Sequence, residues 1–280
     1  MDNFLGIMQG RLLPKYKGHF QAHPVGYWQN EFLIASEFGF DGIEFIFDYH
    51  MAKANPLLIK DGLDEILLLS KKNNIKVRSI CADYFMSSPI FCLEHVIKKR
   101  NLQILKKLII NAHKLSITDI IIPLVDKSSI INNEEKIGNV IKFFDYFFQE
   151  NEVKNVNICL ETDLPAKNFL RLINCIDHPQ IKINYDTGNS ASLGYNFIEE
   201  FDIYGHFVTN IHIKDRVLNG SSIKLGKGNF NFEKFFKYLG NFKYNGIFIL
   251  QTYRSNDAIS SIIPQLSFVK NHIKEYFNIK

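Results

Sequence analysis

Short apolar runs, rich in β-branched and aromatic residues, recur along the whole chain and constrain its fold more than any other feature. Eight such runs can be recognised, at residues 4–9, 42–47, 76–83, 119–125, 156–161, 181–186, 208–213 and 246–251. They are apolar almost throughout rather than at alternate positions, which is typical of strands buried on both faces of a parallel sheet. Their ends lie about 35 residues apart on average, the length of one strand-plus-helix unit.

The segments between these runs have the period of helices. Between the third and fourth runs, apolar residues recur at three- and four-residue steps from Ile97 to Leu115, with lysines between them, which predicts an amphipathic helix. Asn55 and Pro56 predict the start of a helix that continues to Lys71. Residues 134–149 and 258–277 have similar patterns.

Eight alternating strand and helix units, without a Pro-, Gly- or Ser-rich linker, predict an α/β fold. We expect one parallel, eight-stranded (β/α)8 barrel of the TIM type, as a single domain over residues 1–280. The alternative is a doubly wound open sheet. That alternative is disfavoured because no Gly-x-Gly-x-x-Gly turn follows the first run.

Composition excludes several other classes of protein. The chain is 46% hydrophobic, and its 25 Phe and 12 Tyr argue against disorder. No apolar run approaches the ~20 residues needed to span a bilayer, and no signal peptide is evident. A net charge of +4, from 33 basic and 29 acidic residues, gives no argument for nucleic acid as a partner. The four cysteines lack metal-type spacing, which predicts free thiols in a reducing compartment. We therefore expect a cytoplasmic protein that binds neither nucleic acid nor membrane.

Polar residues terminate four successive apolar runs: Glu161, Asp186, His212 and Gln251. In a (β/α)8 barrel, chemistry is placed at the C-terminal ends of the strands. Neighbouring strands lie ~4.8 Å apart, so these side chains can converge. Each one alone could be an ordinary polar residue at a strand end. Together they favour one divalent metal ion, and oxygen and nitrogen donors without thiolate suit Mn²⁺, Mg²⁺, Co²⁺ or Zn²⁺.

Several short motifs resemble the xylose isomerase-like TIM-barrel superfamily, which contains a sugar phosphate isomerase/epimerase family. The motifs lie at residues 160–162, 185–189, 211–216 and 225–232, and residues 6–11 and 40–44 extend the match toward the N-terminus. The superfamily includes sugar and sugar-phosphate isomerases and epimerases, inosose dehydratases and endonuclease IV. The order and spacing of the motifs are specific to the superfamily but not to one reaction.

The resemblance implies a metal site and a reaction type. In the sugar isomerases and epimerases that the chain resembles, a Glu, an Asp, a His and a second Glu on these four strands bind one divalent metal. Glu161, Asp186 and His212 match, but Gln251 stands where the second Glu is expected. Since Gln cannot accept a proton, two-base epimerisation is disfavoured. Proton transfer by one base through an enediolate remains open as a mechanism, and we therefore expect an isomerase.

In this hypothesis the metal polarises a carbonyl and its neighbouring hydroxyl, and Glu161 takes and returns the α-proton. Lys214 is expected to stabilise the enediolate oxygen or to shuttle a proton. Glu44 and His23 are further candidates for a second acid or base. A buried, unpaired Glu is costly, which favours a role in the site for Glu44. For His23 the alternative is an ordinary solvent-facing histidine of a loop.

Substrate contacts are expected from the loops after the strands. Arg11, Arg216 and Arg254 follow the first, seventh and eighth runs, which are neighbours in a closed barrel. Guanidinium groups suit oxyanions, so we predict a phosphorylated or acidic sugar, although a basic chain also places cations in loops by chance. His23 and Asn189 complete the predicted substrate-binding set. The resemblance implies a homodimer as a common assembly.

Three alternative functions remain open. An inosose-dehydratase-like lyase would use the same metal to stabilise an enolate and then expel water. A non-catalytic sugar-binding barrel would have lost its activity with the missing second Glu. An enzyme like endonuclease IV is disfavoured, because Asn189 stands where that family has a histidine ligand.

Overall fold

Eight parallel strands close into a barrel, because the first strand in the sequence pairs with the second on one side and with the last on the other. The computed structural model describes residues 4–277 of the chain. The barrel strands are β1 (Phe4–Met8), β2 (Gly42–Ile46), β3 (Lys76–Cys81), β4 (Asp119–Leu124), β5 (Asn157–Thr162), β6 (Ile181–Asp186), β7 (Val208–Ile213) and β10 (Ile247–Leu250). The predicted (β/α)8 barrel is confirmed, and its closure excludes the open-sheet alternative.

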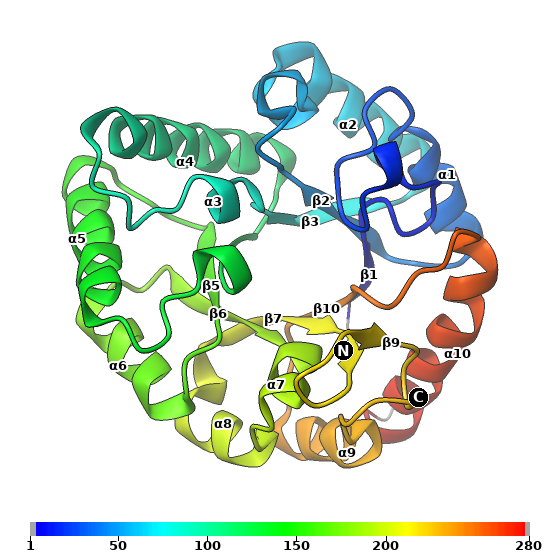
Figure 1. Cartoon of the computed structure of the whole chain (residues 1–280). Coiled ribbons are helices and arrows are strands. Elements are labelled where there is room, and N and C mark those ends of the chain that lie inside the picture. Colours follow the sequence, from blue (N-terminus) through cyan, green and yellow to red (C-terminus); the bar gives the residue numbers. More distant parts are fainter. Residues whose placement is uncertain (1–3, 278–280) are drawn as a thin grey trace.

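The helices form a ring around the strands, and their order in the ring follows the sequence (Figure 1). They are α1 (Asn30–Glu37), α2 (Lys60–Asn73), α3 (Tyr84–Ser87), α4 (His95–Leu115), α5 (Glu134–Glu150), α6 (Ala166–Ile176), α7 (Thr187–Leu193), α8 (Phe197–Tyr204), α9 (Phe232–Phe242) and α10 (Ala258–Tyr276). The short helices α3 and α7 lie inside this ring in the view of Figure 1. Among residues 4–277, no helix is long and apolar enough to cross a membrane.

Burial on both faces explains why the strands are apolar almost throughout. In β10, Phe248 and Leu250 pack into the large core shared with the helices. The alternate residues Ile247 and Ile249 pack into a second cluster with Met8. Since successive side chains of a strand point to opposite faces, one set faces the helices and the other faces the barrel interior.

Two local features differ from the sequence-based expectation. Asn55 and Pro56 do not begin the long helix α2; they cap a separate 3-10 turn, Pro56–Leu58, in which the Asn55 side chain accepts a hydrogen bond from Leu57 N. Ile59 is extended (φ −113°, ψ 133°), which separates this turn from α2. The structure also contains a two-stranded antiparallel sheet, β8 (Asp215–Arg216) with β9 (Ser222–Ile223), in the loop after β7. Strands of two residues leave no periodic signal in a sequence.

Candidate functional site

The side chains of Glu161, Asp186 and His212 meet at the C-terminal end of the barrel. They belong to β5, β6 and β7, three neighbouring strands. Each offers one ligand atom, and these atoms lie within 4.8 Å of one another. All three residues are buried. Two carboxylates and one imidazole at this spacing are a donor set that fits Zn²⁺, Mn²⁺, Co²⁺ or Mg²⁺.

The carboxylates around His212 favour a positive charge on its ring. Burial by itself lowers the pKa of His212, but the carboxylates of Glu44 and Glu161 outweigh this effect and raise that pKa to about 10. His212 Nδ1 lies 3.4 Å from Glu161 Oε2 and 3.0 Å from Asn184 Nδ2. Asn184 Nδ2 also donates to Glu161 Oε2, at 2.7 Å. A cation bound at Nδ1 would face the same carboxylates that now stabilise the protonated ring.

Glu44 holds the other side of the same imidazole. Its Oε1 lies 2.7 Å from His212 Nε2, and its Oε2 accepts hydrogen bonds from Ser79 Oγ at 2.6 Å and Asn210 Nδ2 at 3.0 Å. Because β2 and β7 are not neighbours in the barrel, these contacts cross its interior. Glu44 is fully buried and does not line the cavity described below. Its position is that of the carboxylates that orient metal-ligating histidines.

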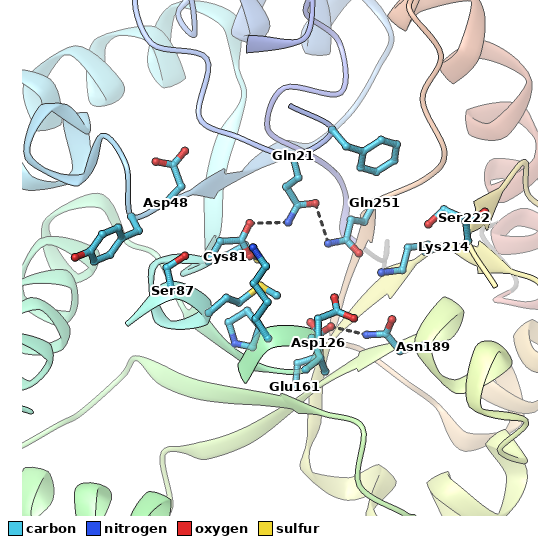
Figure 2. A pocket seen from close by; sticks show the side chains of 18 of the residues that line it. Gln21, Asp48, Cys81, Ser87, Asp126, Glu161, Asn189, Lys214, Ser222 and Gln251 are labelled. Carbon is cyan, nitrogen blue, oxygen red and sulfur yellow. Dashed lines mark hydrogen bonds between the residues drawn. The ribbon is translucent and has the colours of Figure 1, made fainter. Parts of the chain in front are cut away.

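Gln251 follows β10 and presents a free oxygen to the site. Asp83 Oδ2 accepts from Gln21 Nε2 at 2.7 Å, so the Gln21 oxygen points the other way. That oxygen accepts from Arg11, at 2.9 Å, and from Gln251 Nε2, at 3.2 Å. Figure 2 shows Gln21 and Gln251 facing each other. Gln251 Oε1 is thereby buried without a hydrogen-bond partner among the described residues, which makes it available as a neutral metal ligand.

Lys214 lies over the cluster from the residue after β7. Its Nζ forms an ion pair with Asp186 Oδ2 at 2.6 Å. The lysine backbone is fixed on both sides by Thr187, whose Oγ1 donates to Lys214 O and accepts from Lys214 N. A Cβ at position 188 would come within 2.8 Å of the Lys214 side chain. Gly188 is therefore required for the close approach of Lys214 to Asp186.

Asn189 connects Glu161, the base predicted from the sequence, to the cationic side chain of Arg216. Its Nδ2 donates to Glu161 Oε1 at 2.8 Å, and its Oδ1 accepts from Arg216 at 3.0 Å. A second Arg216 nitrogen, Nε, donates to Gly220 O at 2.8 Å. The Glu161 carboxylate is thus held by amides on both oxygens, with Oε2 toward His212 and Oε1 toward Asn189.

A cavity of about 660 Å³ opens above these residues. Six of the predicted site residues line it, namely Arg11, Glu161, Asn189, Lys214, Arg216 and Gln251. Figure 2 shows Lys214, Glu161, Asn189 and Gln251 around the same hollow, with Asp48 and Ser87 on its other side. The volume suits a small organic substrate.

The structure places two predicted substrate-binding residues outside the cavity lining. His23 is buried, and its Nδ1 lies 2.9 Å from Gln9 Oε1. Arg254 is buried and donates to Leu13 O at 2.6 Å. Arg11 lines the cavity, but its guanidinium is hydrogen-bonded to two backbone carbonyls as well as to Gln21. Burial and the nearby Arg254 lower the pKa of Arg11 to about 10, so it remains charged at neutral pH.

Four polar residues of the site were not identified from the sequence. Asn184 and Asn210 lie two residues before Asp186 and His212, so the strand period puts each of them on the same face as the following ligand. This spacing is enough to predict from the sequence that both side chains point toward the site. Asp83 is the last residue of the third apolar run, a position that does not by itself indicate a role in the site. Gln21 lies in an irregular loop, and nothing in the sequence marks it.

Similar proteins were found by sequence and by structure. An uncharacterised protein of Methanocaldococcus jannaschii is 26% identical over 121 residues, which are 41% of this chain. The match covers 38% of the length of that relative.

Three solved structures resemble the whole chain. The IolI protein with a bound zinc atom has a TM-score of 0.76 at 14% identity, covering 99% of this chain and all of that one. The 3-keto-D-glucoside 4-epimerase YcjR of E. coli has a TM-score of 0.74 at 14% identity, and the match covers 96% of this chain and 100% of that one. A D-allulose 3-epimerase from Methylomonas sp., in complex with D-allulose, has a TM-score of 0.69 at 15% identity, and the match covers 97% of this chain and 98% of that one. At these identities the likeness establishes the fold.

The family is established by sequence. A family model described as the xylose isomerase-like TIM barrel matches residues 32–272. This segment contains seven of the eight barrel strands, β2 to β7 and β10. It also contains the carboxylate and histidine cluster of β5, β6 and β7. The chain therefore belongs to the xylose isomerase-like TIM-barrel family, as its motifs implied.

Proposed function

We propose that this protein is a divalent-metal-dependent isomerase or epimerase of a sugar or sugar derivative, which works by proton transfer through an enediolate. The observation that carries the proposal is the buried cluster of Glu161, Asp186 and His212, of which Glu161 lines the cavity. The solved structures that share the fold include epimerases acting on sugars and one structure with bound zinc.

Glu161, Asp186, His212 and the free oxygen of Gln251 would hold the metal. A divalent cation bound there supplies a Lewis acid that polarises a carbonyl oxygen and its neighbouring hydroxyl. The donor set includes two carboxylates, so the site carries negative charge that a cation would offset. Glu44 holds His212 with Nδ1 toward the cluster.

Glu161 is the proposed base. It lines the cavity, and its two oxygens have different surroundings: Oε2 faces His212 and Oε1 accepts from Asn189. We assign Oε2 to metal binding and Oε1 to the proton. In the reaction, the carbon-bound proton next to the carbonyl moves to Glu161, and Glu161 returns it to the adjacent carbon. Lys214, which lies at the cluster, stabilises the developing enediolate oxygen.

Two of the polar side chains that line the cavity, Asn189 and Arg216, are assigned to substrate binding. Asn189 and Arg216 are joined by a hydrogen bond beside Glu161, and we propose that Arg216 binds an anionic or strongly polar group of the substrate. Arg254 and His23 lie behind the lining. We propose that these two residues act on the substrate only indirectly, by holding the loop that carries Arg11.

A lyase is the second candidate. It would use the same cluster and the same first proton transfer, followed by loss of a hydroxyl group instead of protonation of the adjacent carbon. A probable dehydratase has the same fold as this chain, with a TM-score of 0.67. Product analysis separates the two candidates, because only a lyase releases a dehydrated product.

The test is proton exchange with solvent. The Mn²⁺-loaded protein is incubated in D₂O with a panel of aldoses, ketoses and their phosphates, D-allulose among them, and deuterium is followed by NMR. We expect deuterium to enter substrate or product at the carbon next to the carbonyl. Glu161→Gln should reduce this exchange by about 10²- to 10⁴-fold, the range for loss of a general base.

A matched control keeps the test specific. Asp126 also lines the cavity and is exposed, and its φ of 49° is one that Asn adopts readily. Asp126→Asn should therefore retain exchange. If Glu161→Gln retains full exchange, Glu161 is not the base. If the wild type exchanges no sugar of the panel and binds no divalent cation, the proposed reaction is wrong and a sugar-binding barrel is favoured.

A further inference from the structure

The position that carries a second carboxylate in two-base sugar epimerases holds a neutral side chain in this chain. Gln251 cannot accept a proton, yet moving a carbonyl between two carbons also requires a hydroxyl proton to move between two oxygens. Another group at the cavity must therefore exchange this proton. The candidate must line the cavity, be free of a cation partner and belong to an element other than β5.

Asp83 meets these conditions. It follows β3, two strands away from β5 in the closed barrel, and it lines the same cavity as Glu161 and Gln251. Within residues 4–277 it makes no ion pair. Among the same residues, two other carboxylates outside β5 line the cavity without an ion pair, but Asp48 accepts from the backbone N–H groups of His23 and Met51, and Asp126 is exposed. Asp186 pairs with Lys214 and Glu44 pairs with His212.

The hydrogen bonds of Asp83 connect it, through Gln21, to the position of the missing carboxylate. Asp83 Oδ2 accepts from Gln21 Nε2 at 2.7 Å, and Gln21 Oε1 accepts from Gln251 Nε2 at 3.2 Å. Asp83 Oδ1 has only the weak donor Cys81 Sγ, at 3.3 Å. This leaves Oδ1 able to accept a stronger donor, such as a substrate hydroxyl.

The surroundings of Asp83 also suit proton exchange near neutral pH. Burial is the largest effect on its carboxyl and raises its pKa to about 6, against the hydrogen bonds from Gln21 and Cys81, which lower it. A group with such a pKa both takes up and releases a proton at the pH of the cell.

We propose that Asp83 is the second proton-transferring residue of this site. The inference rests on the proposed isomerase reaction. Glu161 moves the carbon-bound proton, and Asp83 takes the proton of the hydroxyl that becomes the carbonyl and delivers it to the oxygen that becomes the hydroxyl. Both carboxyls return to their starting state, and substrate and product differ only in the positions of two hydrogen atoms.

The experiment separates the two proton transfers. The probe is the panel sugar, D-allulose included, that the wild type deuterates fastest in D₂O with Mn²⁺. Asp83→Asn keeps the size of the side chain but removes its base. Deuterium exchange into unreacted substrate, which needs only Glu161, should stay within about threefold of wild type, while product formation falls by at least about 100-fold. Asp83→Glu should restore part of the product formation.

The controls exclude a merely structural role. Asp126→Asn removes another carboxyl that lines the cavity and should leave both rates unchanged. If Asp83→Asn retains product formation, or if exchange and product formation fall together in both Asp83→Asn and Asp83→Glu, the proposal is overturned. A wild type that exchanges no sugar overturns the proposed reaction itself, a result that is visible before any Asp83 variant is measured.

Discussion

At the scale of single residues, the chemistry of this protein depends on how each polar side chain is oriented. Gln251 could present either its oxygen or its nitrogen to the metal cluster. The acceptor Asp83 fixes the orientation of Gln21, and Gln21 in turn fixes that of Gln251. The oxygen of Gln251 is therefore directed away from other donors by residues that lie far from it in sequence.

The sequence predicts a role in the site for Glu44, as a candidate for a second acid or base. The structure places it in the interior, below His212, where it is fully buried. From this position it can act on the substrate only through the imidazole. The prediction that Glu44 is a second acid or base stays untested, and the geometry supports a positioning role.

We predict that Glu44→Gln lowers the affinity for Mn²⁺ by about 10- to 100-fold, the range for loss of a carboxylate that orients a ligating histidine. Isothermal titration calorimetry measures this change. The control is Ser79→Ala, which removes one hydrogen bond to Glu44 but keeps its charge, and it should have a smaller effect. Wild-type affinity in Glu44→Gln would contradict the positioning role.

At the scale of elements, the loop between β1 and α1 contains one short 3-10 helix, Tyr16–Gly18, and is held by buried polar contacts. Glu31 of α1 accepts from Gly10 N at 2.7 Å and from Leu12 N at 3.0 Å. His23 is joined to Gln9, whose Oε1 also accepts from Ile46 N at 3.1 Å. Because this oxygen is an acceptor, His23 Nδ1 carries the proton. The loop that carries Arg11 and Gln21 is thereby fixed against β1 and β2.

This arrangement makes a prediction about pH. Burial lowers the pKa of His23 from 6.5 to about 4, against a smaller opposing effect of Asp48. Above pH 6.5 the histidine is neutral in both states. Between pH 6.5 and 4 the unfolded chain takes up a proton that the folded chain does not, so stability falls as the pH falls. The loss reaches about 3 kcal/mol.

Urea unfolding at several pH values measures this dependence. His23→Gln keeps a hydrogen-bond donor toward Gln9 but does not titrate. Its free energy of unfolding should therefore fall less steeply than that of the wild type between pH 6.5 and 4. Equal slopes for the two proteins would show that His23 is not buried in the neutral form.

At the scale of the whole molecule, closure of the barrel decides which strands are neighbours. The order β1-β10-β7-β6-β5-β4-β3-β2 puts the ends of β5, β6, β7 and β10 in one arc. The same closure lets Glu44 of β2 reach His212 of β7 across the interior. A metal ion bound in this arc would join strands from the second half of the chain and stabilise the folded state as a whole.

We therefore predict that Mn²⁺ stabilises the protein against urea by about 2.7 kcal/mol when the free metal is at 100 times its Kd. Asp186→Asn should abolish most of this gain. The variant is well matched, because Asp186 also caps α7 by accepting from Asn189 N at 2.9 Å, and Asn caps helices equally well. Because Asp186→Asn also removes the ion pair with Lys214, the gain from Mn²⁺ is measured for each protein against its own stability in EDTA. An equal gain from Mn²⁺ in both would place the metal elsewhere.

The sequence by itself determined the barrel and the chemical types at its mouth. Strands buried on both faces must be apolar almost throughout, and the regular recurrence of such runs left little choice of architecture. Polar residues that interrupt this rule at strand ends, such as Glu161 and His212, were visible for the same reason. Helix and strand ends were harder to predict, as the separate turn at Pro56–Leu58 shows.

Only the tertiary structure decided which polar groups contact one another. Arg254 and His23 were expected at the substrate, but both are buried behind the cavity lining by hydrogen bonds to Leu13 and Gln9. Asp83 and Gln21, which the sequence did not distinguish from ordinary loop residues, lie at the cavity. The physical reason is that hydrogen bonds are short and directional. Periodicity tells which face of a strand a side chain occupies, whereas its partner depends on how the barrel closes and how each loop folds over it.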